Sequence, residues 1–266
     1  MSDLSGKVAL VTGATKMKGL GKAVADKLIA AGATVVVTGR EKSMPGAEEV
    51  VASLKAAGGD AMAVAVDVSY QDQIDAAVAK IKEAHGGVDI LVNNAGIGAG
   101  SPNLLENTDR DWDANYAVNV KGAFNLCAGV IPSMEARGGG SIVNVASLAG
   151  IGASVGMPYS YIATKHAIVG ATKALALEFA SKGIRANVVA PGAIATDMLQ
   201  TAYEAIAAAN NISVEEAAKL ENSGIPMGRP ADPGEIADTI VWLAGPASSY
   251  VTGITVPIAG GMSAGI

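Results

Sequence analysis

One stretch of the sequence predicts the fold: Val8-Ala9-Leu10-Val11-Thr12-Gly13-Ala14-Thr15-Lys16-Met17-Lys18-Gly19-Leu20-Gly21. Its first five residues are apolar or β-branched, which predicts a strand buried on both faces. A glycine-rich turn follows, and the stretch from Gly19 to Ala31 predicts a helix that Gly32 ends. A buried strand that leads directly into a helix is typical of a parallel sheet covered by helices.

The same alternation continues along the chain. Further strands are expected at 34–38, 61–66, 89–93, 141–146, 185–190 and 253–256, and further helices at about 47–57 and 71–85. The pattern predicts an α/β fold, a Rossmann-type doubly wound parallel sheet of about seven strands with helices on both faces. Because no repeat or long linker interrupts it, we expect residues 1–266 to form a single domain.

Composition favours a protein that acts on small molecules. Half of the 266 residues are hydrophobic and 17% are charged, so the chain can bury a large core. The net charge is −6 and no basic run occurs, so we expect no nucleic-acid partner. The apolar runs are too short to span a membrane, and the N-terminus opens with polar residues, so we expect no membrane partner and a cytoplasmic location.

The glycine-rich turn predicts a site for a dinucleotide. Glycines between a strand and a helix let the backbone approach a pyrophosphate, and the helix N-terminus presents free N–H groups to it. The turn resembles the T-G-x-x-x-G-x-G motif of the short-chain dehydrogenase/reductase family, with Gly13, Gly19 and Gly21 at the glycine positions. Five residues separate the first two glycines here, where the family pattern has three.

The end of the second strand indicates which cofactor binds. A carboxylate there would accept hydrogen bonds from the ribose of NAD, whereas a 2′-phosphate favours a cation. The strand ends in Gly39-Arg40, and Lys18 matches a second basic position of the family members that prefer NADP. We therefore expect NADP(H) in preference to NAD(H).

Tyr161-Ile162-Ala163-Thr164-Lys165 carries the expected acid/base chemistry. Residues at i and i+4 share a helix face, and a nearby ammonium is expected to lower the pKa of the tyrosine. The segment resembles the family's Y-x-x-x-K motif, and Ser147 and Asn119 match its serine and asparagine in order and spacing. The resemblance implies that Tyr161 transfers the proton, Ser147 polarises the substrate oxygen, Lys165 holds the nicotinamide ribose, and Asn119 positions a relay water.

Other family motifs complete the expected cofactor site, and no metal is expected. They are Asp67-Val68, Asn93-Asn94-Ala95-Gly96 and the segment from Pro191 to Thr196, which resembles P-G-x-x-x-T. The implied cofactor contacts are Gly13, Lys18, Gly19, Leu20, Gly21, Arg40, Asp67, Val68, Asn94, Ala95, Gly96, Tyr161, Lys165, Pro191, Gly192, Ile194 and Thr196.

Residues 197–227 are expected to form a substrate lid. No arginine lies between Arg185 and Arg229, and Lys219 is the only lysine in the lid, which favours a small neutral carbonyl or alcohol. The predicted activity is NADP(H)-dependent interconversion of a secondary alcohol and a ketone. Two alternatives stay open: reduction of a 3-oxoacyl thioester, and a protein that senses the dinucleotide without turnover. The resemblance also implies a homo-oligomer, a tetramer or a dimer.

Overall fold

The computed structural model of the protein describes residues 3–153 and 156–263. All seven strands pair in parallel, in the order β3-β2-β1-β4-β5-β6-β7. The strands are β1 (Val8–Thr12), β2 (Thr34–Gly39), β3 (Ala61–Ala65), β4 (Ile90–Asn93), β5 (Gly140–Val145), β6 (Ile184–Pro191) and β7 (Thr255–Ile258). The predicted doubly wound α/β sheet is confirmed.

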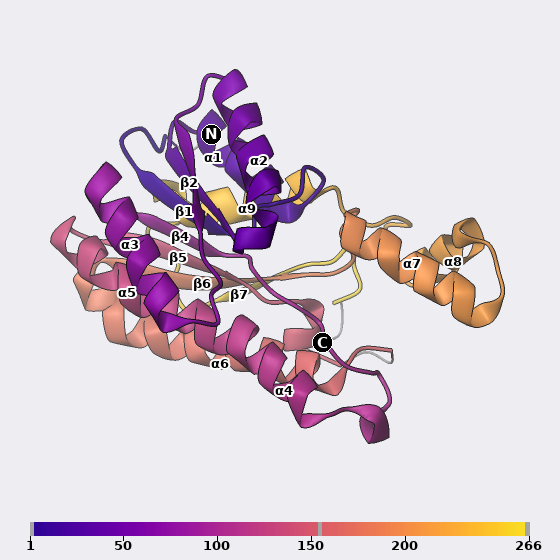
Figure 1. Ribbon diagram of the computed structural model, residues 1–266. Coiled ribbons are helices and arrows are strands. Elements are labelled where there is room, and N and C mark those ends of the chain that lie inside the picture. The colour runs from indigo at the N-terminus through magenta and orange to yellow at the C-terminus, as the bar shows by residue number, and fades with distance from the viewer. Residues whose placement is uncertain (1–2, 154–155, 264–266) are drawn as a thin grey trace.

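Helices cover both faces of the sheet (Figure 1). The α-helices are α1 (Leu20–Ala30), α2 (Met44–Ala56), α3 (Gln71–His85), α4 (Asp109–Asn115), α5 (Ala123–Ala136), α6 (Tyr159–Phe179), α7 (Asp197–Asn210), α8 (Val214–Asn222) and α9 (Pro233–Ala244). Alternate residues of β1 point into two separate cores. Ala9 and Val11 pack with α1, α2 and α9, whereas Val8 and Leu10 pack with α3, α5 and α6. Burial on both faces explains the continuous apolar run of the strand.

Strand order places the functional motifs along one edge. The order reverses between β1 and β4, and ligands of doubly wound sheets bind beside the carboxyl ends of the strands at such a point. The glycine turn follows β1, Asn94 follows β4 and Ser147 follows β5. Parallel pairing therefore brings these segments to the same edge of the sheet.

The opposite edge is anchored by Asp89, which is 3% exposed. Its carboxylate accepts hydrogen bonds from the Val8 amide at 2.9 Å and from the Arg137 guanidinium at 2.7 and 3.0 Å. Burial raises the pKa of Asp89, but the bonds from Arg137 and Val8 and the nearby Lys7 outweigh it, so the pKa lies below its usual value. This ion pair ties β1, β4 and α5 together.

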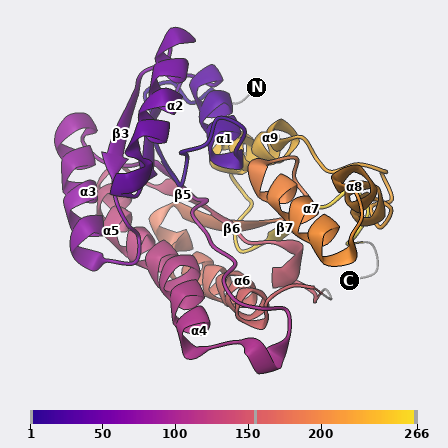
Figure 2. The ribbon, with the colours of Figure 1, turned by 45° about the vertical axis from the view of Figure 1, so that its right-hand side comes forward.

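The helices α7 and α8 form a hairpin that projects from the body in both views (Figures 1 and 2). The hydroxyl of Tyr203 in α7 donates a 2.8 Å hydrogen bond to Oδ1 of Asn222 in α8. The segment expected to be a lid therefore carries two helices, although its closing over a substrate stays a prediction.

Most boundaries lie within one residue of the expected ones, and two elements differ from expectation by two residues or more. The last strand begins at Thr255, because Gly253 adopts a left-handed φ of 77° that interrupts an extended chain. The second helix begins at Met44, where Pro45 occupies its first turn and is compatible with a helix start.

Some expectations lie outside the described residues or stay untested. The expected cytoplasmic location was inferred partly from the polar N-terminal segment, and its residues Met1 and Ser2 lie outside the described part. Residues 154–155 and 264–266 of the expected 1–266 domain lie outside it as well. Within the described ranges, no helix combines the length and the apolar character needed to cross a bilayer.

Candidate active site

The glycine turn and the Asn94-Ala95-Gly96 segment are joined by Thr12. Its Oγ1 accepts hydrogen bonds from the amides of Asn94 (3.0 Å) and Ala95 (2.9 Å), and Asn94 Nδ2 donates to the Thr12 carbonyl at 2.8 Å. Gly13 has a φ of 70°, and a Cβ on it would lie 2.9 Å from the Ala95 Cα. The two expected cofactor motifs therefore pack as one unit. Thr12 was not among the predicted site residues, although it stands at the threonine position of the T-G-x-x-x-G-x-G motif.

The start of α1 fits an anionic ligand. Gly19 is the N-cap, no side chain caps the helix, and its first turn, which contains Leu20 and Gly21, carries no acidic residue. Free N–H groups and the positive end of the helix dipole are the features that bind phosphate groups at helix N-termini. This turn thus fits the pyrophosphate of a dinucleotide.

The longer glycine turn contacts the end of β2. Thr15 contacts Gly39 at the end of the strand and Gly46 in α2, which brings the turn that carries Lys18 beside the strand end that carries Arg40. Lys18 and Arg40 are both exposed, and neither forms an ion pair within the described part of the chain. Both charged groups are therefore available to an anionic ligand.

Asp67 and Val68 follow β3 at the same carboxyl edge. Asp67 Oδ1 accepts a 3.0 Å hydrogen bond from the Ser69 amide, and the Asp67 amide donates to Gln73 Oε1 at 2.8 Å. Val68 is buried against Gly122. These contacts fix the start of α3 and hold both residues at the carboxyl edge of the sheet, while their contact with a cofactor stays a prediction.

Tyr161 and Lys165 lie on α6 one turn apart, as predicted. Lys165 is 5% exposed, its Nζ donates a 2.9 Å hydrogen bond to the Val145 carbonyl, and Nζ lies 5.5 Å from the centroid of the Tyr161 ring. Ser147 follows β5 and accepts a 3.2 Å hydrogen bond from the Ala149 amide. The end of β5 therefore meets the first turns of α6.

The structure corrects the expected pKa of the tyrosine. Burial raises the pKa of Tyr161, and a hydrogen bond with Ser147 offsets this only in part. Burial also lowers the pKa of Lys165 from 10.5 to about 8, so the ammonium is itself destabilised. The prediction that Lys165 lowers the tyrosine pKa is wrong for this structure, because desolvation dominates both groups.

Asn119 lies in η3 (Tyr116–Gly122), a π-helical segment between α4 and α5. Its Oδ1 accepts from the Ile97 amide and its Nδ2 donates to the Ile97 carbonyl, both at 2.8 Å. A Cβ on Gly96 would lie 3.3 Å from Asn119 Oδ1 and 3.5 Å from Lys165 Nζ. Asn119 and Lys165 thus flank the same backbone position, and π-helical turns are frequent at functional sites.

The segment after β6 joins the sheet to the hairpin. The Gly192 amide donates to the Ile258 carbonyl at 3.0 Å, and Ile194 pairs with Ala231 in a parallel bridge. Thr196 is the N-cap residue of α7, and its hydroxyl bonds to the Ile194 carbonyl at 3.3 Å. Pro191 is the last residue of β6, so this expected cofactor segment runs from the edge of the sheet into the hairpin.

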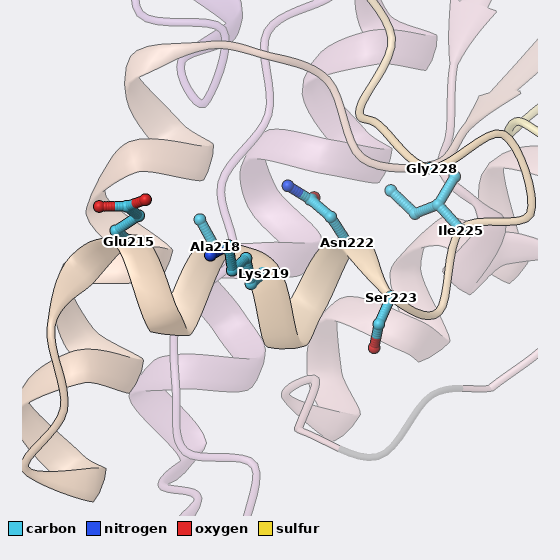
Figure 3. A pocket seen from close by; sticks show the side chains of 7 residues that line it. All are labelled: Glu215, Ala218, Lys219, Asn222, Ser223, Ile225 and Gly228. Carbon is cyan, nitrogen blue, oxygen red and sulfur yellow. The ribbon is translucent and has the colours of Figure 1, made fainter.

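A cavity of about 370 Å³ lies beside α8, and none of the expected catalytic residues lines it. Figure 3 shows the side chains around it. Its lining residues are Glu215, Ala218, Lys219, Asn222, Ser223, Ile225 and Gly228. Lys219, the only lysine of the expected lid, therefore lines this cavity together with Glu215.

The site can supply protons to an oxygen. Tyr161 and Ser147 carry O–H groups, and Lys165 carries a buried amine beside the tyrosine ring. Within residues 3–153 and 156–263, no group of three His, Cys, Asp or Glu side chains is arranged to hold a metal ion. The arrangement suits general acid–base chemistry at a carbonyl or hydroxyl group.

Comparison with known proteins gives consistent matches. The family model for short chain dehydrogenase matches residues 7–207. The 3-oxoacyl-[acyl-carrier-protein] reductase FabG of Thermotoga maritima is 38% identical over 97% of this chain and 98% of its own. The structure of L-sorbose reductase from Gluconobacter frateurii, complexed with NADPH and L-sorbose, superposes with a TM-score of 0.93 at 32% identity and covers both chains fully. A point variant of actinorhodin polyketide ketoreductase, solved with NADPH, has a TM-score of 0.92 and 36% identity, over 99% of this chain and 100% of its own.

Proposed function

The chain belongs to the short-chain dehydrogenase family of oxidoreductases, and from that premise we propose that it interconverts a secondary alcohol and a ketone with NADP(H). The observation that carries the proposal is the meeting of Tyr161, Ser147 and Lys165 beside the glycine turn, at the carboxyl edge of the sheet. A nucleotide-binding turn next to a proton donor is what hydride transfer to a carbonyl requires.

The cofactor is assigned to the residues along this edge. The start of α1, with Gly13 and Gly19, would hold the pyrophosphate, and Lys18 and Arg40 would bind the 2′-phosphate. Two of the structural relatives were solved with NADPH, which supports NADP(H) over NAD(H). When bound, the cofactor supplies or accepts the hydride.

The protein's own residues handle the proton. In reduction, the phenol of Tyr161 donates a proton to the substrate oxygen, and the hydroxyl of Ser147 donates a hydrogen bond to it. A phenol of ordinary pKa near 10 is protonated at neutral pH, and burial raises the pKa of Tyr161, so the phenol carries the proton that it would donate. Lys165 would bind the nicotinamide ribose, and Asn119 would position a water that connects Lys165 to solvent.

The proposed substrate is a small neutral carbonyl compound. Met198, near the start of α7, is 73% exposed and Met157, just before α6, is 41% exposed, so apolar side chains are exposed on the hairpin and just before the helix that carries Tyr161. Arg229, the first arginine after the lid, pairs with Glu235 at 2.7 Å. A phosphorylated or acyl-carrier substrate would favour unpaired cations at this place.

Reduction of a 3-oxoacyl thioester is the second candidate, because a FabG reductase is 38% identical over almost the full length of both chains. It uses the same chemistry at the carbonyl, so only the substrate distinguishes the two. A protein that senses the dinucleotide without turnover is the third reading.

The test is a set of initial rates at 340 nm with NADPH and NADH in parallel, against neutral ketones, diketones, keto sugars and 3-oxoacyl thioesters. We expect turnover of a neutral ketone with NADPH that is lost in Tyr161→Phe. Tyr159→Phe is the matched control, since Tyr159 lies in the same turn of α6 and is 46% exposed. Preference for thioesters would select the second candidate, and NADPH binding without any turnover would select the third.

We also propose that the protein is a homo-oligomer, a tetramer or a dimer. Leu177 on α6 is 86% exposed, and an exposed leucine on a long helix suits a subunit contact. Light scattering after size exclusion would give a multiple of the 26.4 kDa chain mass, whereas a monomer would contradict the proposal.

A further inference from the structure

A buried pair of polar side chains, Asn115 and Ser160, lies next to the proposed proton donor. Asn115 is the last residue of α4 and Ser160 immediately precedes Tyr161 on α6, and both are 0% exposed. Asn115 Nδ2 donates to Ser160 Oγ at 3.0 Å. The two helices are therefore tied together one residue away from the tyrosine.

Both side chains also hold the backbone of Ala99, in the loop after β4. The Ala99 amide donates to Asn115 Oδ1 at 3.2 Å, and the Ala99 carbonyl faces Asn115 Nδ2 at 2.9 Å and Ser160 Oγ at 3.2 Å. Both polar groups of a main-chain residue are thus satisfied by buried side chains. Removing these partners would leave buried groups unpaired, which is costly.

Asn119 holds Ile97 in the same way, so the loop is fixed at two alternate residues. Asn115 and Asn119 are four residues apart, about one turn of the helical segment, so their side chains lie on the same side of it. The two asparagines therefore hold Ile97 and Ala99 from neighbouring turns. Gly98 lies between them.

The fixed loop packs against the ring of Tyr161. A Cβ on Gly98 would lie 3.4 Å from Cδ2 of the Tyr161 ring, which is van der Waals distance. The start of α6 has no side-chain cap of its own, so its first turn depends on contacts such as that of Ser160. The ring is thereby placed from two directions, by the loop and by the helix.

We propose that Asn115 and Ser160 are positioning residues that set the place of the Tyr161 phenol by tying α4, α6 and the Ala99 loop together. The inference rests on the proposed function for its kinetic consequence, but the tie itself is independent of turnover. Neither residue belongs to the motifs from which the site was predicted.

The kinetic test uses Asn115→Ala, Ser160→Ala and the double variant. Misplacing a reacting group by about 1 Å costs on the order of 100-fold in rate, so we expect kcat for ketone reduction to fall about tenfold or more in Asn115→Ala. The KM for NADPH should stay within about twofold, because the phosphate-binding turn is untouched. The double variant should be no slower than Asn115→Ala, since the residues act as one unit.

Asn187→Ala is the matched control. Asn187 is also 0% exposed, and its side chain holds the backbone of Val251 and Ile254 at 2.9 and 3.2 Å on the far side of β6. Its variant should lose stability and keep kcat. If Asn115→Ala reduces kcat no more than Asn187→Ala does, the proposal is wrong. If Asn115→Ala does not fold, Ser160→Ala decides by the same criterion.

Amide hydrogen exchange separates this inference from the proposed function. The Ala99 amide should exchange at least tenfold faster in Asn115→Ala than in the wild type, and at an unchanged rate in Asn187→Ala. An unchanged exchange rate in Asn115→Ala would refute the proposal that Asn115 holds the Ala99 loop. A wild-type protein without turnover would instead refute the proposed function and leave the exchange result to decide on the tie.

Discussion

Replacing Lys165 with methionine should stabilise the fold at neutral pH while it abolishes turnover. The side chain is 5% exposed, and burial lowers the pKa of Lys165 from 10.5 to about 8. At about 1.4 kcal/mol for each pKa unit, this corresponds to roughly 3 kcal/mol that the folded state loses when the amine is protonated. Loss of the hydrogen bond to the Val145 carbonyl costs about 1 kcal/mol, so we expect a net gain of about 2 kcal/mol at pH 7.

The sign of the pH dependence follows from the same shift. Because the folded pKa is below the unfolded value, the unfolded chain binds more protons between pH 8 and 10.5, and the wild type gains stability through this window. The methionine variant lacks this group, so its advantage should shrink to zero or reverse near pH 10.5.

Urea unfolding at pH 7, 9 and 10.5 measures both effects, at one protein concentration. Lys173→Met is the control, because Lys173 lies on the same helix and is exposed, so its variant should show neither effect. A Lys165→Met protein that is less stable than the wild type at pH 7, or whose stability difference is independent of pH, would refute the desolvation argument.

Three further changes test other parts of the structure. Arg40→Asp places a carboxylate at the end of β2 and should lower the NADPH-to-NADH ratio of kcat/KM about tenfold or more in initial-rate assays, whereas Lys55→Asp should not. Gly13→Ala should lower the melting temperature and the affinity for NADPH measured by fluorescence, because its Cβ would meet the backbone of the Asn94-Ala95 turn. The control is Gly58→Ala, since Gly58 has a similar φ of 84° but open space around it. That variant should lose only about 1–2 kcal/mol of the free energy of unfolding. Asp89→Asn should lose about 2 kcal/mol or more at pH 7 in urea unfolding, and its difference from the wild type should shrink at pH 3, because the lowered pKa of Asp89 gives stability that is lost as pH falls through it.

Local patterns in the sequence were sufficient to predict the sheet. Strands buried on both faces leave continuous apolar runs, so the run at 8–12 predicted β1 to the residue, and helix α3 was predicted at 71–85 with its observed bounds. The error at β7 has a local cause, since Gly253 extends the apolar pattern but adopts a left-handed conformation. Apolar spacing does not report the sign of φ.

The motif residues of the site were predictable, but their surroundings were not. Spacing predicted that Tyr161 and Lys165 share a helix face, yet the direction of the tyrosine pKa depends on burial and on distances that spacing does not contain. The contacts of Asn115 and Thr12 were not predicted because their partners lie in distant segments, as with the 2.9 Å bond between the Ala95 amide and Thr12. The one available signal for Asn115 is its position four residues before Asn119.

Isotope transfer tests whether a hydride moves from the nicotinamide to the carbonyl carbon while Tyr161 donates the proton. NADPH that carries deuterium at both C4 positions would be incubated with the preferred ketone, and the alcohol analysed by mass spectrometry, with Tyr161→Phe and Tyr159→Phe in parallel. We expect one deuterium on the carbinol carbon in the wild type and in Tyr159→Phe, and almost no product in Tyr161→Phe. Alcohol without deuterium, or labelled product formed at the wild-type rate by Tyr161→Phe, would contradict it.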